Sequence, residues 1–131
     1  MEIEEISEVV GPRELLVELN LTTDVGPQVK EYLNESKEKF RSCLRLTPRG
    51  GMSSDAIPDD GGSVAVKYAR QAKDFIRTAM DKYQCSRAHL FYAGPLGLAI
   101  FLGQYFNDMG EIQCYERRKD SGYQKSCLLK T

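Results

Sequence analysis

The apolar stretch HLFYAGPLGLAIFLGQ, residues 89–104, restricts the folds open to this chain more than any other part of the sequence. A first apolar run ends at Tyr92, an Ala-Gly-Pro sequence interrupts it, and a second apolar run begins at Leu96. Glycine and proline break regular structure, and proline suits the first helical position, where its missing N–H would be unpaired anyway. The stretch therefore predicts a buried strand that turns into a helix. It is too short and too interrupted to span a membrane.

Strand-like and helix-like patterns alternate along the rest of the chain. Residues 14–23, ELLVELNLTT, alternate apolar and polar positions, which is typical of a strand. Further strands are predicted at 42–47, 87–92, 111–116 and 123–129. Helices are predicted from a Thr23-Asp24 cap to about 41, over 63–83, and over 96–107, the last apolar nearly all round and so expected to be buried on most sides. This order favours an α/β fold: a mostly parallel, Rossmann-like sheet flanked by helices, with a C-terminal β-hairpin.

Length and composition predict one domain over residues 1–131, with 1–12 as a disordered or partner-docking segment. The net charge of -1 argues against binding to long nucleic acid, which requires excess positive charge. Four cysteines without a CxxC pair and a single histidine make a zinc site unlikely to form, so no metal or other cofactor is expected. The acidic N-terminus lacks the features of a signal peptide, and we expect a reducing, cytoplasmic location without a membrane partner.

A catalytic set is poorly supported by the sequence. His89 lies inside a predicted strand, where a packed or hydrogen-bonded histidine is favoured over a general base. Asp55, Asp59 and Asp60 gather in the long Pro- and Gly-rich loop 48–63, where helix capping at Asp60 or Ser63 is the stronger interpretation. That loop is long enough for a lid to be considered. The charged face of the helix over 63–83 is interpreted as a solvated surface rather than a binding stripe.

Ligands of open parallel sheets bind beyond the carboxyl ends of the strands, beside helix N-termini. Three strand ends carry small or polar residues there, and they give these candidate ligand-binding residues: Thr22, Thr23, Asp24, Tyr92, Ala93, Gly94, Pro95, Leu96, Tyr115, Arg117 and Arg118. Gly94 permits close backbone approach, and the helix that follows offers free N–H groups to a phosphate, although a plain strand-to-helix turn explains the same residues. At the third strand end, two interpretations stay open. The arginines pair with phosphate and the tyrosine stacks on a base, or the segment is an ordinary hairpin with solvated charges. A bulky residue in place of Gly94 should weaken binding and leave most of the fold intact.

The stretch from Ser63 to Leu129 resembles the C-terminal half of a SAVED domain, the ligand-sensing module of bacterial anti-phage signalling in CBASS and CRISPR systems. The resemblance rests on the HLFYAGP sequence at 89–95, the Leu-Ala and Leu-Gly pairs at 98–99 and 102–103, the IQCYE sequence at 112–116, and the closing strand at 123–129. The amphipathic helix before these motifs and the opening strand that ends in Leu-Thr-Thr-Asp also fit.

SAVED domains resemble two fused CARF-like units that bind cyclic oligonucleotides and drive an attached effector. The resemblance implies that Thr22, Thr23, Asp24 and the turn at 93–96 face a cyclic oligonucleotide second messenger, with the 115–118 strand end flanking it. The implied protein partners are an effector or a second SAVED/CARF-like half, with a homo-oligomer expected. The chain departs from the family in holding one half and no effector, so a truncated chain, a split subunit and a dimerising sensor all stay open.

Two other functions remain open from the sequence. One is a ring-nuclease-like enzyme that cleaves a cyclic oligonucleotide with Thr22, Thr23, Tyr92 and Arg117. The other is a protein-only interaction subunit of a defence complex, whose mark would be an exposed apolar patch on the helix over 96–106.

Overall fold

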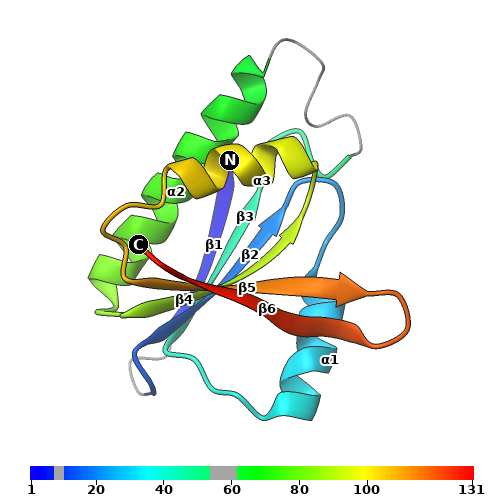
Figure 1. The fold of residues 1–131 in the computed structure, drawn as a ribbon, viewed down its shortest axis with the longest axis vertical. Helices are drawn as coiled ribbons and strands as arrows, with labels where there is room; N and C mark the ends of the chain where they lie inside the picture. The colour runs from blue at the N-terminus through cyan, green and yellow to red at the C-terminus, as the bar shows by residue number, and fades with distance from the viewer. Residues whose placement is uncertain (8–10, 54–61) are drawn as a thin grey trace.

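Six strands and three helices make up the fold of the computed structural model, which describes residues 1–7, 11–53 and 62–131 (Figure 1). In chain order these elements are β1 (Glu2–Ser7), β2 (Glu14–Asn20), α1 (Gly26–Ser36), β3 (Ser42–Thr47), α2 (Ser63–Lys82), β4 (Arg87–Ala93), α3 (Leu96–Gln104), β5 (Glu111–Arg118) and β6 (Gly122–Lys130). Asp55, Asp59 and Asp60, with half of the loop expected at 48–63, lie outside the described residues.

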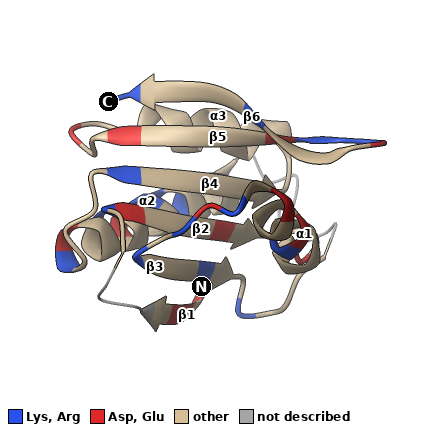
Figure 2. Cartoon of the chain, turned by 90° about the horizontal axis from the view of Figure 1, so that it is seen from below, with Lys and Arg blue, Asp and Glu red and all other residues tan. Residues whose placement is uncertain are grey.

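The strands form one sheet in the order β1-β3-β2-β4-β5-β6, and Figure 2 shows them stacked in this order. The four central strands are parallel, while β1 and β6 run antiparallel at the two edges. The chain leaves β2 toward β3 on one side and later enters β4 on the other. The carboxyl ends of β2 and β4 therefore meet at the topological switch point of the sheet.

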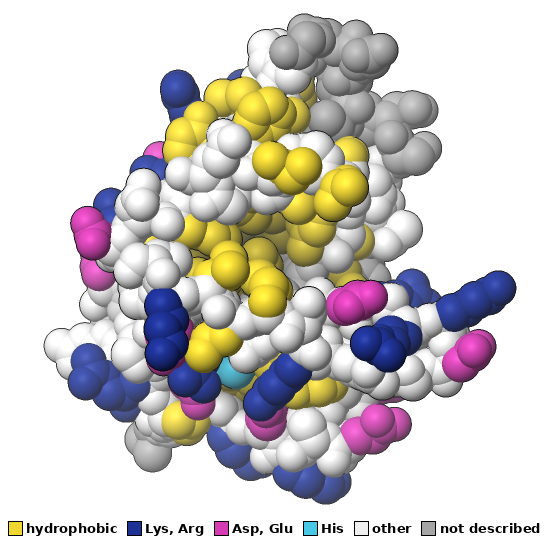
Figure 3. Space-filling model, viewed as in Figure 1, with side chains coloured by type: hydrophobic (Ala, Val, Ile, Leu, Met, Phe, Trp, Pro, Cys, Tyr) yellow, Lys and Arg dark blue, Asp and Glu magenta, His cyan; other side chains and the backbone are white. Residues whose placement is uncertain are grey.

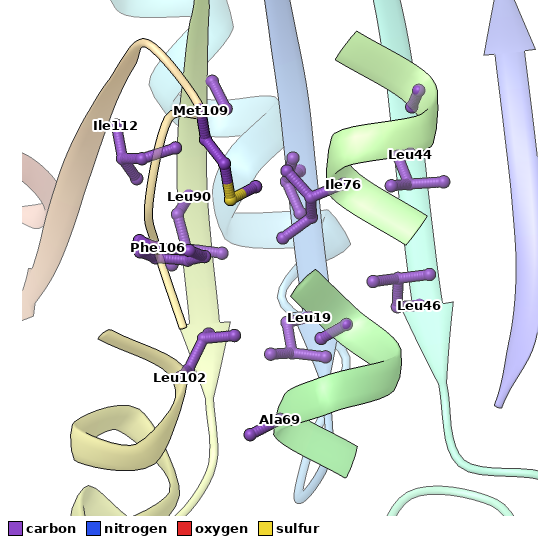
Figure 4. Packing of buried hydrophobic residues seen from close by; sticks show 14 of the residues in the cluster. Leu19, Leu44, Leu46, Ala69, Ile76, Leu90, Leu102, Phe106, Met109 and Ile112 are labelled. Carbon is purple, nitrogen blue, oxygen red and sulfur yellow. The ribbon is translucent and has the colours of Figure 1, made fainter. Parts of the chain in front are cut away.

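Helices cover the two faces of the sheet unequally. Helices α2 and α3 pack on one face, over a large apolar cluster that includes Leu19, Leu44 and Ile76 (Figure 4). Helix α1 packs on the other face over a smaller cluster, in which Val29, Phe91 and Tyr123 are buried. Alternation along β2 explains the division, because successive side chains of a strand point to opposite faces.

The mostly parallel α/β sheet with a C-terminal hairpin is confirmed, and the differences are local. Residues 2–7 form the edge strand β1, paired with β3, so this part of the segment taken as disordered or partner-docking belongs to the sheet. Helix α1 is shorter than predicted, because Lys37 adopts a left-handed conformation (φ 60°) and its N–H bonds to the carbonyl of Leu33, which ends the helix. Helix α3 stops at Gln104 rather than near 107, and it is less buried than expected, since Leu96 and Ile100 are 78% and 58% exposed.

Candidate functional site

One carbonyl group joins the two strand ends at the switch point. The oxygen of Ala93, the last residue of β4, accepts the N–H groups of Leu21 (3.0 Å) and Thr22 (3.1 Å), which follow β2. This bond pair brings the loop after β2 against the end of β4. Thr22 and the residues 93–95 are half-buried, whereas Thr23, Asp24 and Leu96 are exposed. We call this set of residues, 22–24 and 93–96, the switch-point edge.

The segment after β2 is held by side chains of its own strand and turn. Asn20 is fully buried, and its Oδ1 accepts the N–H of Val25 at 2.8 Å. Asp24 Oδ1 accepts the N–H of Gly26, the first residue of α1, at 2.7 Å. The N-cap residue itself is Val25 rather than Thr23 or Asp24, although Asp24 does satisfy an amide of the first turn. The chain thus enters α1 along a fixed path beside the edge.

Arg45 on β3 anchors Asp24 from the neighbouring strand. Its guanidinium lies 2.9 Å from Asp24 Oδ1, 3.1 Å from Glu18 Oε1 and 3.7 Å from Glu4 Oε2. Glu18 is buried, and burial raises its pKa while the charge of Arg45 opposes the rise. A Cβ atom at Gly26 would lie 2.6 Å from Nη1 of Arg45 and 2.9 Å from Asp24 Oδ1, so a larger residue there would shift these two side chains. Asp24 is therefore largely committed to internal contacts, and a ligand would meet it as part of this charged cluster.

The turn between β4 and α3 answers why glycine and proline interrupt the apolar run. Tyr92 folds back so that its hydroxyl donates a hydrogen bond to the carbonyl of Pro95, and burial raises the pKa of that hydroxyl. A Cβ atom at Gly94 would lie 2.5 Å from Tyr92 Oη, so glycine makes room for this ring. A larger residue at Gly94 would therefore displace the Tyr92 side chain, so such a variant would change the turn as well as any ligand contact.

Helix α3 starts at the switch-point edge without a side-chain cap. Leu96 is the first helical residue, as predicted, and Pro95 is the N-cap residue before it, with extended backbone (φ -65°, ψ 144°). Helix α1 also begins here, directly after Asp24. The positive ends of two helix dipoles therefore flank the same edge, and uncapped N–H groups of α3 are available to an acceptor.

The third predicted strand end is placed elsewhere. Pairing between β4 and β5 stops at Leu90 and Cys114, and the pairing of β5 with β6 shifts register between Gln113 and Tyr115. Beyond this point β5 stays with β6, and Figure 1 shows the hairpin projecting away from the end of β4. Arg117 and Arg118 are exposed on that hairpin, apart from the switch-point edge. They stay predicted ligand residues without a structural link to the other candidates.

Tyr115 belongs to an aromatic cluster beneath α1. Its ring stacks on Phe91 at 4.0 Å between centroids and meets Tyr32 edge-on at 5.1 Å. Its hydroxyl lies 2.7 Å from Nδ1 of His89, and burial raises its pKa. Because only 9% of the residue is exposed and one ring face is taken by Phe91, Tyr115 offers a base no free surface in this structure.

His89 has both ring nitrogens engaged. Nε2 lies 2.8 Å from Glu14 Oε1, Nδ1 faces Tyr115, and 3% of the residue is exposed. Burial lowers the pKa of the imidazole, and the Glu14 carboxylate opposes this. The packed, hydrogen-bonded histidine predicted from the sequence is confirmed.

The described residues offer little for covalent or metal chemistry. Burial raises the pKa of the Cys43 and Cys114 thiols to about 12, which disfavours the nucleophilic thiolate. No group of three or more His, Cys, Asp or Glu side chains among residues 1–7, 11–53 and 62–131 is arranged to hold a metal ion. A membrane-crossing helix, long and apolar enough to span a bilayer, is likewise not found in the described part of the chain.

A hollow of about 340 Å³ between α1 and the hairpin turn does not extend the edge. Glu31, Glu35 and Asp120 contribute to its lining, together with Tyr32 and Tyr123. Three carboxylate-bearing residues disfavour a phosphate group there.

Asn20 and Arg45 are residues of this region that the sequence-based selection omitted. Asn20 Nδ2 is buried and has no hydrogen-bond partner among the described residues, directly beneath the edge. A polar residue at the end of an otherwise apolar strand was the available signal for Asn20. No local pattern identifies Arg45, because its partners come from β1, β2 and the turn after β2.

Comparison with known proteins relates the whole chain to one family of sensors. The family described as "SMODS-associated and fused to various effectors sensor domain" (SAVED) matches residues 1–129. CD-NTase-associated protein 4 of Enterobacter hormaechei is 28% identical over 122 residues, covering 89% of this chain and 24% of that protein. The protein of the same name from an Acinetobacter species is 29% identical over 112 residues, covering 86% of this chain and 22% of its own. The chain thus spans about a quarter of the length of the curated relatives it matches.

Solved structures show the same fold. The Acinetobacter baumannii Cap4 SAVED/CARF-domain containing receptor, in complex with the cyclic trinucleotide 3'3'3'-cAAA, matches all of this chain and 28% of that chain, with a TM-score of 0.79 and 23% identity. The complex of that receptor with 2'3'3'-cAAA matches 98% of this chain and 27% of that chain, with a TM-score of 0.69 and 23% identity.

Proposed function

Since the chain belongs to the SAVED family of sensor domains, we propose that it binds a cyclic oligonucleotide at the switch-point edge and passes that event to an effector in anti-phage defence. The relatives support the ligand class, because the Acinetobacter baumannii receptor of the same fold is seen with cyclic trinucleotides. The joining of the two strand ends through the Ala93 carbonyl is the observation that carries the proposal for this chain. It builds one continuous edge from two loops that are far apart in sequence.

The edge has the chemistry that a small phosphate ring requires. Helix α3 begins at the edge, and no side chain caps its first amides, which leaves the positive end of its dipole open to a phosphate. The first amide of α1 is instead taken by the Asp24 carboxylate. Thr22 and Thr23 add hydroxyl groups that donate to phosphate or accept from a base. Such a local site does not depend on the net charge of the chain, which is -1.

A binding screen with matched threonine variants tests the proposal. The purified chain is titrated with cyclic di-, tri- and tetranucleotides and with linear oligonucleotides of the same bases. Thr23→Glu places a carboxylate at the exposed edge, and we expect affinity for the bound cyclic species to fall at least about tenfold through repulsion of its phosphates. Thr78→Glu, at an exposed position of α2, adds the same charge elsewhere and should leave affinity unchanged.

Two results count against the proposal. Equal weakening by Thr23→Glu and Thr78→Glu would mean that the edge does not bind the phosphates. Failure of every cyclic oligonucleotide to bind, with the chain alone and with a second SAVED half added, would contradict the ligand class.

Helix α3 supports a protein partner at the same end of the molecule. Leu96 and Ile100 lie four residues apart on one helix face and are 78% and 58% exposed, and Figure 3 shows hydrophobic side chains gathered over α3. We propose that a second CARF-like half, from another chain or another copy, covers this face when ligand is bound. An exposed apolar patch on this helix is the feature that the sequence analysis expected of an interaction subunit.

Light scattering with and without the bound cyclic oligonucleotide tests this partner. A ligand-dependent doubling of mass that Leu96→Ser and Ile100→Ser abolish is the expected result for a second copy. A strict monomer in both conditions excludes self-pairing. Mixing with a separate SAVED half then decides between a different chain and no partner at this face.

A further inference from the structure

A second hollow lies on the β1 side of the sheet and shares no lining residue with the switch-point edge. It has a volume of about 390 Å³ and is lined by Met1, Arg49, Lys67, Tyr68, Gln71 and Phe75. Arg49 follows β3, and the residues at 67, 71 and 75 are spaced by four along α2, so one helix face forms its wall. The hollow is thus formed by α2 and the segment that follows β3.

The two cations of this hollow differ from the other cations of α2. Arg70 bonds to the hydroxyl of Tyr105, Lys73 pairs with Asp74, and Arg77 bonds to the carbonyl of Asn107. Each of these side chains is tied to a neighbouring group of the fold. Lys67 and Arg49 instead make no ion pair or hydrogen bond with the described residues, and both are exposed.

An uncommitted polar atom and two aromatic rings complete the lining. Gln71 Oε1 is buried and has no hydrogen-bond partner among the described residues. A buried acceptor without a donor costs free energy, so a group that donates to it is favoured. Tyr68 and Phe75 are half-buried, pack against the main core and leave part of each ring at the hollow.

From this combination we infer that the hollow binds a nucleoside monophosphate. Arg49 and Lys67 would hold the phosphate, Gln71 would accept a hydrogen bond from an amino or hydroxyl group, and the ring of Tyr68 or Phe75 would support the base. None of the described residues that line this hollow carries a carboxylate, in contrast to the hollow between α1 and the hairpin. This inference goes beyond the proposed cyclic-oligonucleotide function, because it needs different residues and a different ligand.

Titration of the chain with adenosine 5'-monophosphate, followed by amide chemical shifts, tests the inference. We expect saturable shifts at 49 and 67–75 and little change at 22–24 and 93–96. The double variant Arg49→Ala/Lys67→Ala should weaken binding at least about tenfold, as expected for loss of two charge-assisted contacts. Lys30→Ala, which removes an exposed cation of α1, is the matched control and should bind as the original chain does.

Adenosine and inorganic phosphate separate the two parts of the ligand. Each should bind more weakly than the monophosphate, and Tyr68→Leu should weaken the monophosphate while leaving inorganic phosphate unchanged. The inference is overturned if the monophosphate does not bind at low-millimolar concentration, if shifts appear only at the switch-point edge, or if the double variant matches Lys30→Ala. Equal binding of phosphate and monophosphate would reject recognition of the nucleoside. None of these results depends on binding of a cyclic oligonucleotide, so the two proposals fail separately.

Discussion

The two faces of the sheet are held by different kinds of interaction. Beneath α2 and α3, apolar side chains such as Leu19 and Ile76 interlock in one large cluster. Beneath α1 the same strands present Glu14, Glu18 and Asn20, and stability there depends on hydrogen bonds, ion pairs and stacked rings. The difference shows that the two faces of one strand can be stabilised in different ways. One face depends on how well apolar side chains fill the core, and the other on specific hydrogen-bond and ion-pair partners. The switch-point edge is anchored from the second layer.

Truncation in the apolar face should have the largest effect. Ile76→Ala removes a side chain that is 1% exposed, and we expect the free energy of unfolding to fall by about 3 kcal/mol. Ile100→Ala makes the same change on α3 at a residue that is 58% exposed, and it should cost less than about 1 kcal/mol. Urea denaturation of both variants measures the difference. Equal losses would show that α3 is covered in solution or that the face around Ile76 is loosely packed.

Removal of a partner from the α1 face should have a smaller but pH-dependent effect. Arg45→Met leaves the Glu18 carboxylate buried without its cation, and we expect a loss of about 2 kcal/mol at neutral pH. Without Arg45 the pKa of Glu18 rises further, so the variant should recover part of this loss as the pH falls and Glu18 becomes neutral. Denaturation between pH 5 and 7, with the exposed Arg118→Met as control, measures this. A loss that stays constant over the range would argue that packing, rather than charge, is what Arg45 contributes.

Titration of His89 should give the smallest effect and sharpen the comparison most. Burial places the folded pKa of His89 below its unfolded value, so the unfolded chain binds more protons as the pH falls. The contribution of His89 to stability is therefore complete above the unfolded pKa, about 6.5, and is lost as the pH falls toward the folded pKa. His89→Gln should remove this part of the pH dependence. Parallel stability profiles for the variant and the original chain would mean that His89 does not titrate differently on folding.

The apolar face could be predicted from the sequence because its buried residues recur at the spacing of a strand or a helix. Alternation of Leu15, Val17 and Leu19, and the stripe along residues 63–83, identify both strand and helix. The ends of β2 and β4 could also be located, because Thr23-Asp24 and Gly94-Pro95 are typical of turns that end a strand. The sequence did not show that these two ends are neighbours, because no local pattern encodes the order of strands in a sheet.

What the sequence missed lies mainly on the other face and at the edges. Strand β1 was not recognised because EIEEIS carries acidic side chains that suit a solvated edge as well as an unpaired segment. Tyr115 was placed at the ligand edge because sequence does not reveal that β5 leaves β4 after Cys114. Arg45 and Glu18 form an ion pair between neighbouring strands, and no local sequence spacing predicts such a pair.

The Ala93 carbonyl has a spectroscopic consequence. Its oxygen accepts two amide N–H groups of the loop after β2, so the carbon-13 chemical shift of this carbonyl depends on how the two loops lie relative to each other. The amide hydrogens of Leu21 and Thr22 should exchange with deuterium in a single opening event rather than independently. A carbon-13 label at that one carbonyl would therefore register any event that separates the two loops.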